Sequence, residues 1–101
     1  MALFPCNIGS SGGTPSNAVL VWRTGSSATY TFTKDYSLIV ACAADTNSAV
    51  STSYSGNGTR LVNNYQQMSG AYVFSCLSVI ANVKAGDTMH VVYNGMIWSL
   101  E

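Results

Sequence analysis

One histidine and three internal aspartates are the residues of this chain best suited to acid–base chemistry. His90 lies in a predicted strand, and Asp87 precedes it by three residues on a predicted turn. A histidine placed between a serine and a carboxylate is the general base of many hydrolases. A strand histidine more commonly packs or forms a hydrogen bond. A small hydrolase on a β scaffold is therefore kept as one alternative function.

The internal carboxylates Asp35, Asp45 and Asp87 all fall in predicted turns. Aspartate in a turn commonly accepts hydrogen bonds from nearby backbone amides, whereas hydrolysis by paired carboxylates needs two of them a few ångströms apart in a cleft. The sequence contains neither a Gly-Lys-Ser/Thr phosphate loop nor a dinucleotide fingerprint. We therefore expect no catalytic residues and no cofactor.

Three cysteines, Cys6, Cys42 and Cys76, are far apart and odd in number. This spacing argues against a zinc site and against a disulfide framework. Cys42 and Cys76 lie in apolar runs and are predicted to be buried free thiols. We expect no bound metal.

Charge is scarce: 8% of the residues are charged, 48% are hydrophobic, and the formal net charge is zero. No basic stripe is present to neutralise phosphates, which argues against nucleic-acid binding. No apolar run approaches the roughly 20 residues that span a bilayer, and no signal peptide is visible. An uncharged surface protects poorly against association, which points to a homo-oligomer.

The chain divides into two parts by composition. Residues 1–17 are predicted to be an N-terminal arm with a Gly/Ser-rich linker, and Leu3-Phe4 could serve as an apolar plug on this tether. Residues 18–101 are predicted to form one β-sandwich domain.

Short runs rich in Val, Thr, Tyr and Ser recur from Ala18 onward, separated by turn residues. Ser55-Gly56-Asn57-Gly58 and Asn94-Gly95 are typical of hairpin turns. The fold class expected is all-β, a compact jelly-roll-like β-sandwich of about eight short antiparallel strands. The predicted strands are Ala18–Trp22, Ala28–Thr33, Tyr36–Ala44, Ala49–Tyr54, Thr59–Tyr65, Ala71–Val83, Thr88–Tyr93 and Met96–Leu100.

The two longest apolar strands, Tyr36–Ala44 and Ala71–Val83, have no polar face. A sandwich strand in a monomer buries one face and wets the other, and no helices are predicted that could cover a second face. Packing against neighbouring subunits explains both faces. The candidate oligomer interface consists of Ile39, Ala41, Ala43, Val73, Leu77, Val79 and Ala81.

A second candidate surface is rich in amide groups. Amide and aromatic side chains together suit contact with carbohydrate or protein, although one ring folded onto the core would explain the same residues. The candidate ligand loop consists of Asn63, Asn64, Tyr65, Gln66 and Gln67.

The segment from Val83 to Val91, Val-Lys-Ala-Gly-Asp-Thr-Met-His-Val, follows a long apolar strand. It resembles the Lys-x-Gly-Asp-x-hydrophobic signature of the tumour-necrosis-factor and complement-head-like jelly rolls. The segment from Tyr30 to Val40 is similar to the aromatic strand pair of the same family. Small domains of this kind occur in bacteriophage fibre, tail-tip and head-decoration proteins, which the leader before the Gly/Ser tether also resembles. The resemblance implies a homotrimer about a three-fold axis, with receptor or glycan binding on loops or subunit clefts.

The function expected is therefore a non-enzymatic structural or binding module. The favoured form is a homotrimeric virion component, made in the bacterial cytoplasm, that contacts other virion proteins or a host-surface receptor or glycan. The alternatives are a secreted cytokine-like or complement-like trimeric ligand and the small hydrolase.

Overall fold

A computed structural model describes residues 18–70 and 72–100, and these residues form an all-β fold of eight strands. The strands are β1 (Ala18–Thr24), β2 (Ala28–Thr31), β3 (Tyr36–Ala44), β4 (Ser51–Ser55), β5 (Thr59–Ser69), β6 (Tyr72–Val83), β7 (Thr88–Val92) and β8 (Gly95–Leu100).

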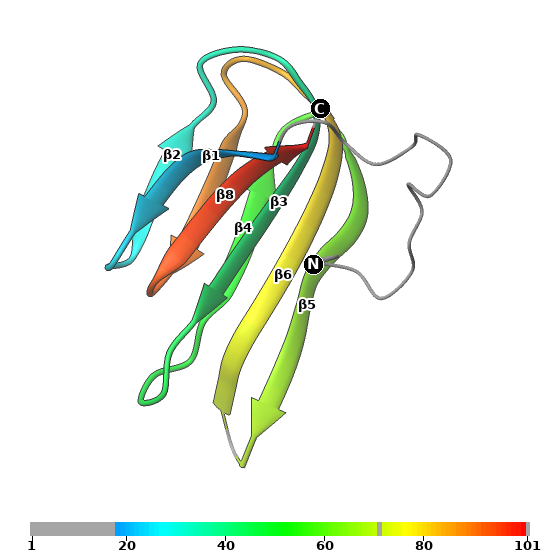
Figure 1. The fold of residues 1–101 in the computed structure, drawn as a ribbon. Coiled ribbons are helices and arrows are strands. Elements are labelled where there is room, and N and C mark those ends of the chain that lie inside the picture. Colours follow the sequence, from blue (N-terminus) through cyan, green and yellow to red (C-terminus); the bar gives the residue numbers. More distant parts are fainter. Residues whose placement is uncertain (1–17, 71, 101) are drawn as a thin grey trace.

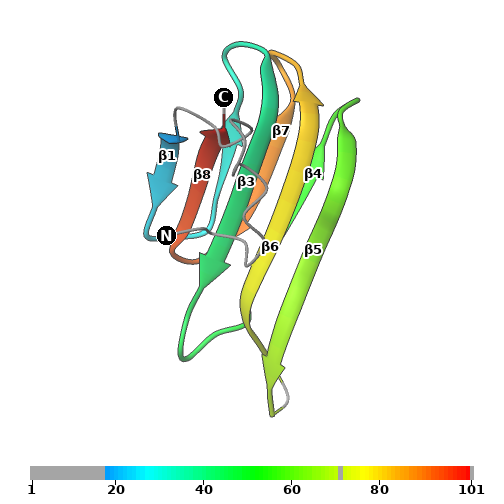
Figure 2. The same ribbon diagram turned by 45° about the vertical axis from the view of Figure 1, so that its right-hand side comes forward.

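The strands pair into two antiparallel sheets that pack face to face. The larger sheet has the order β1-β8-β3-β6-β5, and the smaller has the order β2-β7-β4. Figures 1 and 2 show the strands of the larger sheet side by side in one layer, with the smaller sheet as a second layer. The predicted β-sandwich is thereby confirmed.

The core lies between the two sheets. Its largest side chains include Phe32, Ile39, Ile80, Met89 and Ile97, each at most 1% exposed. Burying a side chain of this size stabilises the fold by about 1.5–3 kcal/mol. The core is thus supplied by both sheets and holds them together.

Each lateral margin of the sandwich is closed in a different way. At the β1/β2 margin the ring of Tyr30 lies 5.3 Å from that of Trp22 and 5.2 Å from that of Phe32, measured between centroids. At the β4/β5 margin the backbone N–H of Thr52 donates to Asn64 Oδ1 over 3.1 Å, and Thr52 Oγ1 lies within hydrogen-bond distance, 2.7 Å, of Ser78 Oγ on β6. Aromatic packing closes the first margin, and hydrogen bonds close the second.

Two predicted hairpins are wrong. The Ser55–Gly58 turn joins β4 to β5, and the turn near Asn94-Gly95 joins β7 to β8, yet each connection links strands of different sheets. At the second turn the positive φ angles belong to Tyr93 (65°) and Asn94 (51°). Turn residues indicate where the chain reverses its direction. Which sheet each flanking strand joins depends on how that strand is buried.

The predicted arm and its Leu3-Phe4 plug lie outside the described residues. Within residues 18–70 and 72–100, no helix has the length and apolar character needed to cross a membrane.

Candidate functional site: the outer face of the larger sheet

Most outward-facing side chains of the larger sheet form apolar rows, and the polar exceptions on β5 and β6 are Thr59, opposite Ala81, and the pair Gln67 and Ser75. Residues that lie opposite one another on paired strands share a face of the sheet, so the strand register identifies each row. The rows are Leu20-Trp98-Val40-Val79-Val62, then Met96-Cys42-Leu77-Tyr65, then Leu38-Ala81. We call these eleven residues the outer face.

The outer face is apolar at its centre and exposed at its margins. Val40 and Val79 are 2% and 6% exposed, whereas Leu20 and Tyr65 at the margins are 41% and 67% exposed. Arg23, opposite Met96 on β1, is the one charged residue in register with these rows. The smaller sheet packs on the other side, and no described strand covers the outer face. An apolar sheet surface of this extent is typical of an interaction site.

The outward face of the smaller sheet provides an internal comparison. Its cross-strand rows are mostly hydroxyl-bearing, with Thr29 and Ser53 flanking His90, and Thr31 and Ser55 flanking Thr88. This is the pattern expected of a sandwich sheet that faces water. The two sheets therefore differ: one has an ordinary polar outer surface, and the other does not.

The candidate interface predicted from sequence is partly wrong. Ile39, Ala41 and Ala43 belong to the core between the sheets, and Val73 packs against that core. The β3–β6 register pairs odd-numbered with even-numbered residues, for example Ile39 with Ile80, so Leu77, Val79 and Ala81 of β6 lie on the face opposite that of Ile39, Ala41 and Ala43.

The remaining three residues of the predicted interface, Leu77, Val79 and Ala81, do lie on the outer face, opposite Cys42, Val40 and Leu38. The interface predicted from sequence left out the outer-face residues of β1, β3 and β8, namely Leu20, Leu38, Val40, Cys42, Met96 and Trp98. Side chains of β8 alternate between the two faces of the sheet: Ile97 and Ser99 are buried, and Met96 and Trp98 are half-buried. The alternation along this strand is the sequence signal that could have placed Met96 and Trp98 on one face.

The predicted ligand loop is a strand. Asn63, Asn64, Tyr65, Gln66 and Gln67 lie within β5, which continues to Ser69 and pairs with β6. Asn64 is occupied in closing the margin against Thr52 and Ser78, whereas the other four side chains are exposed. A binding role for this segment stays a prediction, now for an edge strand.

His90 lies on the outward face of the smaller sheet, bonded to hydroxyl groups. Its Nδ1 lies 2.7 Å from Thr29 Oγ1, and its Nε2 lies 3.4 Å from Ser27 Oγ. The position that a carboxylate holds in a hydrolase triad is thus taken by a threonine hydroxyl. The predicted partner Asp87 instead bonds Tyr54 and Lys84.

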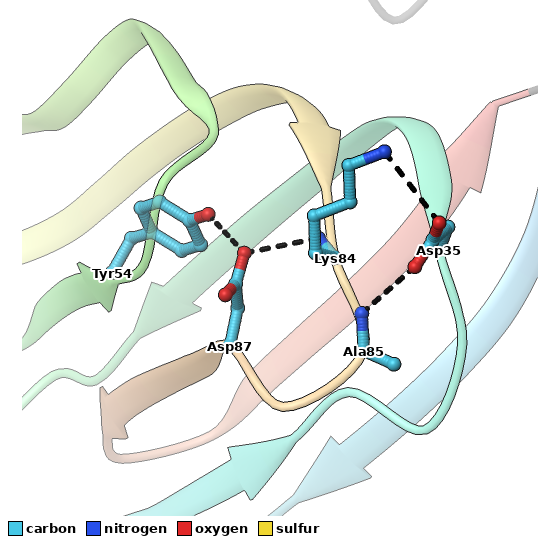
Figure 3. Close-up of polar contacts among 5 residues, drawn as sticks. All are labelled: Asp35, Tyr54, Lys84, Ala85 and Asp87. Carbon is cyan, nitrogen blue, oxygen red and sulfur yellow. Dashed lines mark hydrogen bonds and ion pairs between the residues drawn. The ribbon is translucent and has the colours of Figure 1, made fainter.

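Asp87 joins the turn before β7 to Tyr54 of β4 (Figure 3). Its Oδ2 accepts hydrogen bonds from Tyr54 Oη over 2.5 Å and from the backbone N–H of Lys84 over 3.0 Å. Gly86 has φ +97°, and a Cβ atom on Gly56 would come within 2.3 Å of the Asp87 carboxyl carbon. The Gly-Asp motif therefore forms a structural contact in this chain.

The hydrogen bonds set the direction of two pKa shifts in this contact. The hydrogen bond from Tyr54, with that from the Lys84 backbone, lowers the pKa of Asp87. Burial, with the hydrogen bond to Asp87, raises the pKa of Tyr54. Both shifts favour a charged Asp87 beside a neutral Tyr54.

The other internal carboxylates also accept hydrogen bonds from backbone amides, but only Asp45 bonds within its own turn as predicted, whereas Asp35 bonds an amide of another turn. Asp35 accepts from the Ala85 backbone, which lowers the pKa of Asp35, and forms an exposed ion pair with Lys84 at 3.5 Å. Asp45 accepts from the Asn47 backbone. Asp45 therefore stabilises its own turn and also accepts from the Asn94 side chain, and Asp35 links two turns.

Cys42 and Cys76 are free thiols on opposite faces of the larger sheet. Cys76 is buried in the core at 5% exposure, and Cys42 is half-buried on the outer face. Burial raises the pKa of both thiols. Within the described ranges, no three His, Cys, Asp or Glu side chains are grouped so as to hold a metal ion.

Two open hollows lie at the β1 side of the molecule. One of about 370 Å³ is lined by residues that include Arg23, Asn94 and Met96, and one of about 280 Å³ includes Tyr30, Lys34 and Tyr36. The Lys34 ammonium lies 5.3 Å from the centre of the Tyr36 ring. Sequence reasoning identified neither hollow, because each combines residues distant along the chain.

Comparison of the chain with protein-family models, with curated proteins and with solved structures found no match.

Proposed function

We propose that this protein is a non-enzymatic structural or binding module that works as a homo-oligomer, with the outer face as the contact between copies. The observation that carries the proposal is the apolar outer face, which no described strand covers. Contact with a second copy removes the exposed part of this face from water, chiefly its margins at Leu20 and Tyr65, at about 25 cal/mol per Å² of apolar surface.

Charge supports a second copy as the occupant. The net charge is zero, and Arg23 at the margin is the one charge in register with the apolar rows. Two identical outer faces therefore meet without appreciable charge repulsion. The hydroxyl-rich face of the smaller sheet remains in solvent in such an assembly.

A jelly-roll fold and a three-fold oligomer are the finer form of the proposal. Successive strands alternate between the sheets except at the β5–β6 hairpin, and β8 returns beside β1 and β3. Eight strands whose connections cross between two antiparallel sheets are a feature of jelly rolls. Together with the similarity of Val83–Val91 to the family signature, they support a trimer.

We place the trimer in a bacteriophage particle, as a fibre, tail-tip or capsid-decoration protein. The support is the resemblance of the N-terminal leader and tether to such proteins. In this setting the partners are other virion proteins and a host-surface receptor or glycan.

A fluorophosphonate probe that labels Ser27 would contradict the non-enzymatic part of the proposal.

Cys42 offers a direct probe of the outer face. In a Cys6→Ser background, we expect maleimide labelling of Cys42 to slow at least tenfold as the protein concentration rises and the face becomes covered. Labelling of Cys76 should stay slow throughout, because that thiol lies in the core.

The matched control is Val92→Cys, made together with Cys42→Ala. Val92 is half-buried on the outward face of the smaller sheet, so its thiol should react at a rate independent of concentration. Contact through the outer face would be contradicted if the labelling rates of both thiols depended equally on protein concentration. It would also be contradicted if the labelling rate of Cys42 did not depend on concentration.

A further inference from the structure

Strand β5 is a long, open edge of the larger sheet. It pairs with β6 on one side, and no described strand pairs with it on the other. It has 11 residues, against about 5–6 for an average strand. Of the side chains described in it, all but Val62 and Asn64 are exposed. An edge of this length presents unpaired backbone groups that favour pairing with another chain.

The usual protections of an edge strand are weak in β5. Natural edges commonly carry lysine or proline, or bulges that bend the strand. β5 contains no Lys and no Pro, and its one charge, Arg60, is held by the Tyr54 carbonyl and ring. The register of β5 is irregular between Arg60 and Tyr65 and again between Gln67 and Met68, so the regularly paired part is Tyr65–Gln67, opposite Leu77, Cys76 and Ser75.

The exposed side chains of β5 suit a copy of the same strand. Leu61, Tyr65 and Met68 are 59%, 67% and 58% exposed. The amides of Gln66 and Gln67 each donate and accept hydrogen bonds, so an identical side chain is a fitting partner. No charged residue occurs from Leu61 through Val83. Two copies of this edge therefore approach without charge repulsion.

We propose that β5 pairs with β5 of a second copy, antiparallel and about a two-fold axis centred near Gln66, which joins two five-stranded sheets into one of ten strands. Such a contact is isologous, with each strand serving as the partner of the other. It uses the backbone edge of the sheet, whereas the outer-face contact uses the side chains on the sheet surface, to which β5 contributes Val62 and Tyr65. Where outer-face contacts assemble trimers, the β5 contact links one trimer to another.

Charge placed at Gln66 tests this contact. Gln66 lies opposite Cys76, whose side chain is in the core, so Gln66 is not part of the outer face. Gln66→Lys and Gln66→Glu each bring like charges together at the two-fold axis. We expect each variant alone to weaken the β5 contact at least tenfold and a 1:1 mixture to restore it.

The readout is the mass by light scattering, with Asn47→Lys as a control at an exposed position between β3 and β4. We expect the assembled mass of the wild type and of Asn47→Lys to be at least twice that of each Gln66 variant alone. A 1:1 mixture of Gln66→Lys and Gln66→Glu should return to the wild-type mass. A wild-type trimer whose mass no Gln66 variant changes would overturn the β5 contact and leave the proposed function standing. A dimer that Gln66→Lys converts to monomer would support the β5 contact and contradict the trimer.

Discussion

Leu77→Asp should reduce the assembled mass of the protein threefold while leaving the β-sandwich folded. Leu77 is half-buried on the outer face, between Cys42 of β3 and Tyr65 of β5. A carboxylate there meets an apolar partner surface and loses its hydration without gaining a counter-charge. A cost of about 2 kcal/mol for each contact weakens that contact about 30-fold. Light scattering at micromolar concentration measures the loss.

Val92→Asp is the matched control for this substitution. Val92 is likewise a half-buried apolar residue that faces outward from its sheet, but it lies among hydroxyl groups on the smaller sheet. It should leave the assembled mass unchanged, and far-UV circular dichroism should show both variants folded. Equal loss of assembly in the two variants would mean that the effect comes from the fold rather than from the outer face.

Asp87→Asn should lower the free energy of unfolding by about 2 kcal/mol, because hydrogen bonds to a charged group contribute roughly 1.5–3 kcal/mol. Asp87 is 9% exposed, and its Oδ2 accepts from both Tyr54 and the Lys84 backbone. An asparagine has one carbonyl oxygen and no charge, so it cannot reproduce both contacts at full strength. Urea unfolding at one fixed protein concentration measures the change.

The same substitution should flatten the dependence of stability on pH in acid. The pKa of Asp87 is lower in the folded protein than the unfolded value of about 3.9. The stabilisation from its carboxylate is therefore complete above that unfolded value and is lost as pH falls through the lower folded pKa. Below pH 4 the wild type should lose stability more steeply than Asp87→Asn.

Asp35→Asn is the control for both measurements, since Asp35 is an exposed carboxylate on the neighbouring turn (Figure 3). Its effect on the free energy of unfolding should be much smaller than that of Asp87→Asn. If the two substitutions were equivalent, the contact between Asp87 and Tyr54 would not stabilise the fold.

The sequence predicts the strands far better than their assembly. The bounds of Tyr36–Ala44 are those of β3, because alternation along a strand and turn residues at its ends are local signals. The register of β3 against β6 depends on residues some 40 positions apart, and its parity places Ile39 and Val79 on opposite faces. A pattern within one strand carries no information about that parity.

The amide segment shows a second limit of local signals. Asn63–Gln67 has the composition of a loop, yet pairing with β6 and the bonds of Asn64 to Thr52 and Ser78 hold it as a strand. Tertiary contacts override weak strand propensity here. The apolar character of both faces of β3 and β6, by contrast, is evident in their residues and leads to the outer face.

The mass of the unmodified protein in solution at micromolar concentration tests self-assembly most directly. The chain mass is 10.7 kDa, so three copies have a mass of about 32 kDa. Light scattering should give this mass or a multiple of it. A single species of 10.7 kDa that does not change with concentration would contradict assembly through the outer face.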